Sequence, residues 1–218
     1  MTNLLPAGIF AAKPTLYGER ATLRPFQPRD ITAMADILAD PEVLRLTGSV
    51  HSSTEAEAET GAGDGRLDAE TRRWCETRAA QEDRLDLAVI AADSGACVGE
   101  VVLNEWSPDN DDCNFRILLG PAGRDRGIGS EATRLVVDHA FRSTAINRIG
   151  LEVYAFNPRA RHVYERAGFV SEGTRRGALK FDGGYVDAEV MSLRRSDWSL
   201  RTSTARPPVR EPAGTKGR

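Results

Sequence analysis

A glycine-rich turn between an alternating strand and an amphipathic helix is the feature of this chain that most restricts its fold. In residues 113–119 every second side chain is apolar, which is typical of a strand with one buried face. In residues 127–142 the apolar side chains recur at helical spacing. The glycine-rich residues 120–126 leave no room for another element between them. The sequence therefore predicts a strand that runs directly into a helix, as in α/β proteins.

Two more alternating segments come directly before this strand. Residues 85–91 and 96–104 both read as strands, with a turn at 93–95 and a second turn at 107–111. Strands joined by such short turns pair antiparallel. The chain from 85 to 119 is therefore predicted to be a three-stranded antiparallel meander.

The remaining segments complete a mixed sheet with helices on its faces. We expect seven strands and about four helices, which is an α/β fold class in its mixed-sheet (α+β) form. The other strands are expected at residues 17–24, 148–156, 169–174 and 185–193. The helices are expected at residues 27–40, 69–81 (anchored by Trp74), 127–142 and 157–167.

The pattern also divides the chain into three parts. Residues 1–16 are expected to be an extended leader, 17–198 the folded domain and 199–218 a disordered tail. Within the domain, residues 48–70 are small and polar, which predicts a mobile loop or a lid.

Composition excludes several classes of function. The net charge of −3 gives no basic surface for nucleic acid, and no run of about 18 apolar residues could span a membrane. The N-terminus lacks the cationic start of a signal peptide, so the cytoplasm is the expected location. Cys75, Cys97 and Cys113 form no CxxC pair, which favours reduced core cysteines, and no cluster has metal-ligand spacing.

The turn before the helix at 127 has the chemistry of an anion site. The first N–H groups of a helix lack internal partners, and the helix dipole adds positive charge there. Glycines allow a ligand to approach the backbone, while Arg124 and Arg126 supply cationic donors for phosphate. The same pattern also suits a plain turn. A nucleotide P-loop is disfavoured because Ser130 stands where its lysine would be, and the preceding meander is the wrong setting for a dinucleotide fold.

Four ordered motifs connect this turn to a known family. The spacing Arg124-x-x-Gly127-x-Gly129 resembles the acyl-CoA signature of the GNAT superfamily of N-acyltransferases. Residues 157–169, led by Asn157-Pro158 and ending in Gly-Phe, look like the second motif of that family. Residues 18–26 and 181–187 are similar to the opening and closing segments of its ribosomal-protein-alanine acetyltransferase branch. The resemblance spans residues 17–195, and within the branch it extends to mycobacterial members regarded as succinyltransferases.

The resemblance implies that acyl-CoA is the cosubstrate and that the fold is GNAT-like. It places the pantetheine arm along strand amides and the diphosphate on the N–H groups of the turn. Asn157 would face the pantetheine arm, act as a plain helix cap, or do both. The implied strand residues are Leu118, Leu119 and Gly120. The implied diphosphate residues are Arg124, Asp125, Arg126, Gly127, Ile128, Gly129 and Ser130.

The resemblance also implies catalytic roles. Tyr164 stands where many members place the acid that protonates the leaving thiolate, although its helical spacing equally suits a core residue. Glu172 matches a glutamate proposed as the base in the ribosomal branch, with Glu100 and Glu152 as rivals. A backbone N–H near Leu119 is the expected donor to the oxyanion.

The predicted function is transfer of an acetyl or succinyl group from acyl-CoA to a primary amine. Small-molecule and peptide acceptors both stay open, as does homo-oligomer formation. A succinyl carboxylate would need cations, which could come from Arg159, Arg161, Arg175, Arg176 and Lys180. The alternatives are a non-catalytic acyl-CoA sensor and a phosphate-binding or nucleotide-binding module unrelated to CoA.

Overall fold

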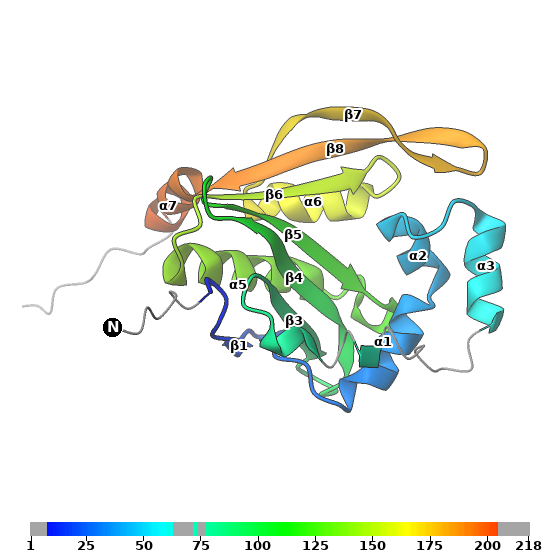
Figure 1. Cartoon of the computed structure of the whole chain (residues 1–218), viewed down its shortest axis with the longest axis horizontal. Helices are drawn as coiled ribbons and strands as arrows, with labels where there is room; N and C mark the ends of the chain where they lie inside the picture. Colours follow the sequence, from blue (N-terminus) through cyan, green and yellow to red (C-terminus); the bar gives the residue numbers. More distant parts are fainter. Residues whose placement is uncertain (1–7, 63–71, 74–76, 205–218) are drawn as a thin grey trace, which may run out of the picture.

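The computed structural model describes residues 8–62, 72–73 and 77–204, and arranges them around one mixed sheet (Figure 1). The sheet has eight strands in the order β1-β2-β3-β4-β5-β6-β8-β7. All neighbours are antiparallel except β5 and β6. The strands are β1 Leu16–Tyr17, β2 Ala21–Arg24, β3 Leu85–Ala91, β4 Cys97–Ser107, β5 Asp112–Leu119, β6 Arg148–Tyr154, β7 Val170–Phe181 and β8 Gly184–Arg194.

The predicted mixed α/β sheet and its meander are confirmed, with one strand more than expected. The segment predicted as a single strand at 17–24 turns between Gly18 and Ala21, where the N–H of Gly18 donates to the carbonyl of Ala21 at 2.9 Å. This turn divides it into β1 and β2, which pair with each other.

Helices cover both faces of the sheet. They are α1 Asp30–Leu38, α2 Pro41–Thr47, α3 Ser53–Ala62, α5 Ile128–Ser143, α6 Pro158–Ala167 and α7 Arg195–Thr204, with short 3-10 turns η1 Arg78–Ala80 and η2 Pro121–Gly123. Alternate residues of β5 face opposite layers: Phe115 joins the main core under α5 and α6, while Leu118 packs with Met34 of α1 and Val43 of α2. No described helix is long and apolar enough to cross a membrane.

The two parallel strands separate at the middle of the sheet. β5 pairs with β6 only at residues 112–114, opposite residues 148–150. On its other side β5 stays paired with β4 as far as Leu119. The last residues of β5 therefore have one backbone edge without a neighbouring strand.

The expectation of a mobile loop over residues 48–70 is wrong for the part that is described. Residues 53–62 form α3, whose first turn is capped locally: the N–H of Glu55 donates to Ser52 Oγ, and the N–H of His51 donates to the Glu55 carboxylate. The unpredicted helix α2 precedes it, because Asp40 accepts the N–H of Val43 as an N-cap and Pro41 suits the first turn.

Three other expectations meet the structure only in part. Most of the helix predicted at 69–81, with Trp74 and Cys75, lies outside the described residues. The tail predicted from 199 begins inside α7, and residues 205–218 are not described. In the predicted leader, Phe10 is buried in the main core, so at least this part of the leader packs against the domain.

A buried ion cluster sits beside β3 and β4. Arg78 is 1% exposed, donates to Asp86 at 3.1 Å, pairs with Glu100, and lies over the ring of Phe26. Burial of such charges is tolerated only when they are paired, so the carboxylate of Glu100 has a structural partner. Glu100, a rival candidate for the base, is therefore buried in this cluster and does not line the cleft described below.

Candidate active site

The gap between β5 and β6 opens into a cleft of about 770 Å³. Residues from β5, the turn before α5, and α6 line one part of it, which we call the donor half because the residues implied to hold the cosubstrate lie there. Residues from α2, β4, β6 and β7 line the other part, which we call the acceptor half. Predicted site residues that line the cleft are Leu118, Leu119, Arg124, Asp125, Gly127, Gly129, Ser130, Asn157 and Tyr164. Predicted residues outside this lining are Gly120, Arg126, Ile128 and Glu172.

The free backbone edge of β5 belongs to alternate residues. The N–H of Gly120 donates to the carbonyl of Val98 on β4 at 2.9 Å. Because successive residues of a strand direct their backbone groups to opposite sides, those of Leu118 also face β4. The groups of Ile117 and Leu119 face the gap instead. Of the three strand residues that the resemblance implies, Leu119 has its backbone groups toward the gap, while those of Leu118 and Gly120 face β4. Ile117, which the sequence did not indicate, also faces the gap.

The N-terminus of α5 carries the expected unpaired N–H groups. Gly127 adopts φ +75°, a conformation that favours glycine, and no side chain caps the helix among the described residues. The first helical bond runs from the N–H of Glu131 to the carbonyl of Gly127. The N–H groups of Ile128, Gly129 and Ser130 therefore remain for an anion, which suits a phosphate at this end of the cleft.

The two predicted cationic donors behave differently from each other. Arg124 lines the cleft, but its guanidinium pairs with Asp40 at 2.5 Å and with Glu42. Its Nε donates to the carbonyl of Leu119 at 2.9 Å. Arg126 pairs with Asp93 and lines a separate hollow. In its place the structure brings Arg159 of α6 to the mouth of the cleft.

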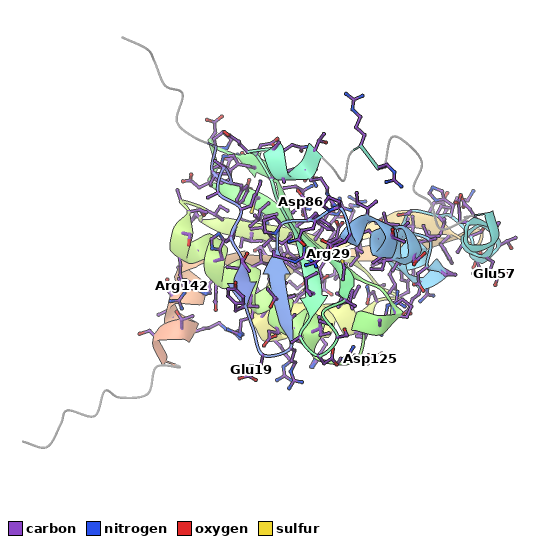
Figure 2. The ribbon with its side chains drawn as sticks, turned by 90° about the horizontal axis from the view of Figure 1, so that it is seen from below. Glu19, Arg29, Glu57, Asp86, Asp125 and Arg142 are labelled. Carbon is purple, nitrogen blue, oxygen red and sulfur yellow. The ribbon has the colours of Figure 1, made fainter. Side chains whose placement is uncertain are left out.

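A carboxylate in the first turn of α5 fixes the neighbouring strands. Glu131 accepts the backbone N–H groups of Glu19, Arg20 and Ala21 at 2.7–2.9 Å. Figure 2 shows Glu19 on the same edge of the molecule as Asp125 of the glycine-rich turn. Burial opposes ionisation of Glu131, but the three N–H donors outweigh it and lower its pKa. Glu131 thus joins the strand turn to the helix end that forms the anion site.

Replacing Glu131 with glutamine should reduce the free energy of unfolding by about 1–2 kcal/mol at pH 7, because hydrogen bonds to a charged acceptor are lost. The lowered folded pKa means that the contribution is complete above the unfolded pKa of about 4.3 and disappears as pH falls through the folded value. Urea unfolding at pH 7 and pH 3 measures the free energy of unfolding of the wild type and of Glu131→Gln. The difference between the two proteins should be smaller at pH 3 than at pH 7. A Glu165→Gln control on α6 should change little, and an equal cost of Glu131→Gln at both pH values would contradict the assignment.

Tyr164 of α6 lines the donor half. It is 7% exposed, and its ring meets Phe115 edge-on at 5.8 Å and Phe169 at 6.1 Å. Burial raises its pKa, so the phenol stays protonated at neutral pH. No described group accepts a hydrogen bond from the hydroxyl. The side chain is therefore both a core residue and a protonated group on the wall of the cleft.

Asn157 caps a helix, and the role that the resemblance implies for it toward the pantetheine arm stays a prediction. Its Oδ1 accepts the N–H of Ala160 at 3.1 Å and so caps α6. The residue also lines the cleft, so its amide nitrogen is available to a ligand.

Glu172 is not placed as a base for this cleft. Its carboxylate accepts the hydroxyl of Ser192 at 2.5 Å and pairs with Arg148 at 2.6 Å, and both donors lower its pKa. Its strand, β7, is the edge strand beyond β8, while β6 borders the gap. Besides Asp125, two glutamate carboxylates line the cleft: Glu152, which pairs with Arg175 at 2.9 Å, and Glu105, which has a positive φ of 54°.

Comparisons with known proteins agree with this geometry. Residues 20–170 match the family model described as an acetyltransferase (GNAT) domain. The prophage-derived N-acetyltransferase YokL of Bacillus subtilis, itself uncharacterised, is 25% identical over 84% of this chain and 94% of its own. YdaF of Bacillus subtilis, provisionally described as a ribosomal N-acetyltransferase, is 24% identical over 83% of this chain and 94% of its own.

Among solved structures, the spermidine N-acetyltransferase of Vibrio cholerae, in complex with CoA and spermine, superposes with a TM-score of 0.69. It is 20% identical and covers 84% of this chain and 99% of its own. These matches include no succinyltransferase and no mycobacterial protein, so they do not support the resemblance to mycobacterial succinyltransferases. The family match covers more than half of the sequence, in the region that holds the cleft: the chain belongs to the GNAT acetyltransferase family.

Proposed function

We propose that the protein transfers an acyl group from acyl-CoA to the primary amine of a small molecule. The observation that carries this proposal is the free edge of β5, which leads directly to the unpaired N–H groups at the start of α5. A pantetheine arm needs strand-like hydrogen-bonding partners, and its diphosphate needs a helix N-terminus. The cleft offers both in line, with its acceptor half continuing to the other face of the sheet.

The reaction can be written with the residues of this chain. The amine attacks the thioester carbonyl, a C–N bond forms, and the carbonyl oxygen becomes an oxyanion that the N–H of Leu119 is positioned to receive. The C–S bond then breaks, and Tyr164 gives its proton to the leaving sulfur. Glu152 takes the proton that the attacking amine loses. Proton exchange with solvent returns both side chains to their starting states.

The small-molecule acceptor is supported by the shape and charge of the acceptor half. Val43, Leu46 and Thr47 of α2 close one side of it, and Tyr154 of β6 lines it as well. The carboxylates of Glu105 and Glu152 can attract an ammonium group before it is deprotonated. The solved relative from Vibrio cholerae is a spermidine N-acetyltransferase, which is consistent with an amine of this size.

Acetyl-CoA is the donor that the acetyltransferase relatives support, and succinyl-CoA is the second candidate. One observation favours succinyl-CoA: Arg116 lines the cleft, is exposed, and has no ion pair among the described residues. The nearby cation Arg175 is already paired with Glu152. An acyl group that ends in a carboxylate would give Arg116 a partner.

The test measures thiol release from acetyl-CoA and from succinyl-CoA with a panel of primary amines, together with calorimetric binding of each donor. We expect both binding and release with at least one donor. If succinyl-CoA is used, Arg116→Met should reduce its kcat/KM about tenfold or more and leave that of acetyl-CoA unchanged. Binding without release for any amine would favour the sensor, and stronger binding of ATP than of either donor would refute the proposal.

A further inference from the structure

One carboxylate of α2 lies between two guanidinium groups at the mouth of the donor half. Glu42 places Oε1 at 3.2 Å from Arg159 and places Oε2 against Arg124. Arg124 and Arg159 both line the cleft, as do Gly127 and Gly129 of the anion site. The chain thus holds an anion of its own beside the place proposed for the cosubstrate phosphates.

The contacts of this carboxylate differ in strength. Arg124 is only 10% exposed and has a second partner, Asp40, at 2.5 Å, so it stays fixed when one partner leaves. The side chains of Glu42 and Arg159 are each 44% exposed. An ion pair this exposed is worth about 0–1 kcal/mol. A phosphate carries more charge and more acceptor oxygens than a carboxylate, so it can displace Glu42.

We infer that Glu42 is an internal substitute for a phosphate of the cosubstrate and acts as a positioning residue. Together with Asp40, which pairs with Arg124, and Asp125, which pairs with Arg159 at 3.2 Å, it holds both guanidinium groups beside the cleft before the cosubstrate binds. The incoming phosphate then replaces Glu42. This inference rests on the proposed use of acyl-CoA. The cost of the replacement is that cosubstrate affinity is lower than it would be without the Glu42 carboxylate.

The replacement also connects the two halves of the cleft. Glu42 is followed directly by Val43, which lines the acceptor half together with Leu46 and Thr47 of the same helix. Asp40, the residue directly before this helix, stays paired with Arg124. When the phosphate frees Glu42, α2 loses its ion pairs with Arg124 and Arg159 and stays connected to the donor half through Asp40. Cosubstrate binding therefore loosens the wall against which the acceptor lies, which favours binding of the cosubstrate first.

Calorimetric titration of CoA into the wild type and into Glu42→Gln tests the first step. We expect the glutamine variant to bind CoA about threefold to fivefold more tightly, because the competing charge is gone. Glu165→Gln, which removes an exposed carboxylate paired with Arg161 on α6, should leave the affinity unchanged. A merely structural Glu42 would give equal or weaker binding in the variant, and that result would overturn the inference.

Hydrogen exchange tests the second step. Addition of CoA should speed exchange of the amides of residues 44–47 in the wild type and should have a much smaller effect in Glu42→Gln. No acceleration in the wild type would overturn the connection to α2. If the wild type binds CoA and Glu42→Gln binds it no more tightly, only this inference is refuted. A wild type that does not bind CoA at all refutes the proposed function as well.

Discussion

Replacing Tyr164 with phenylalanine should lower kcat for acyl transfer by about 100-fold to 1,000-fold at pH 7, with little change in the affinity for CoA. The hydroxyl is the group proposed to protonate the leaving thiolate, and general acid catalysis contributes effects of this size. The phenylalanine ring can keep the contacts with Phe115 and Phe169. Because no described group accepts a hydrogen bond from the hydroxyl, the variant should also fold with nearly wild-type stability.

Tyr154→Phe is the matched control for this experiment. Tyr154 also lines the cleft and loses the same hydroxyl in the variant, but it has no proposed part in proton transfer. The measurement is steady-state thiol release, with thermal unfolding of both variants to confirm that they are folded. A Tyr164→Phe enzyme within threefold of the wild type, or an equal loss in Tyr154→Phe, would remove Tyr164 from the mechanism.

Replacing Glu152 with glutamine should lower kcat about 100-fold at pH 7, and the loss should shrink as pH rises. Glutamine keeps the size of the side chain and can still accept a hydrogen bond from Arg175, but it cannot take a proton from the attacking ammonium. At higher pH a growing share of the amine is already deprotonated, since the pKa of an alkyl ammonium is about 10.4. A purely structural loss would show no such recovery.

The pH–rate profile of Glu152→Gln is the deciding measurement, and two controls accompany it. Glu105→Gln changes the other glutamate that lines the cleft, and Glu172→Gln changes the glutamate that the sequence favoured. We expect Glu172→Gln to affect stability more than turnover, because Ser192 and Arg148 hold its carboxylate. A pH-dependent loss in Glu105→Gln or Glu172→Gln, with none in Glu152→Gln, would move the role of base to that residue.

The difference between Glu172 and Glu152 shows where sequence reasoning reached its limit. Both residues lie in segments that the pattern correctly assigned to strands. The chain order gives no sign that β8 lies between β6 and β7, so the strand with Glu152 borders the gap and the strand with Glu172 forms the edge. Motif position alone favoured a carboxylate that does not line the cleft, because strand order is fixed by pairing between distant segments.

The helix α3 was missed for a different reason, because its signal is local. Ser52 and Glu55 have the spacing of a capping box, and both take part in the hydrogen bonds that begin the helix. The small, polar composition of residues 48–70 predicts a loop, although alanine and glutamate favour helices. Capping residues were therefore the better guide to this segment than its average polarity.

The sequence by itself determined the features that depend on neighbouring residues. Periodic apolar side chains specified the meander and α5, Gly127 marked the turn, and Asn157 with Pro158 marked the start of α6. Each of these follows from interactions within one or two turns of the backbone, so the pattern is readable without the fold.

Only the tertiary structure decided which groups face the cleft. The pairing of β5 with β4 turned the backbone of Leu119, rather than that of Leu118 or Gly120, away from β4, and the separation of β5 from β6 left that edge open. Arg124, which the sequence predicts to donate hydrogen bonds to a phosphate, pairs with Asp40, 84 positions earlier in the chain. Long-range pairs of this kind arise when the chain packs and brings charges together, and no local pattern of residues encodes them.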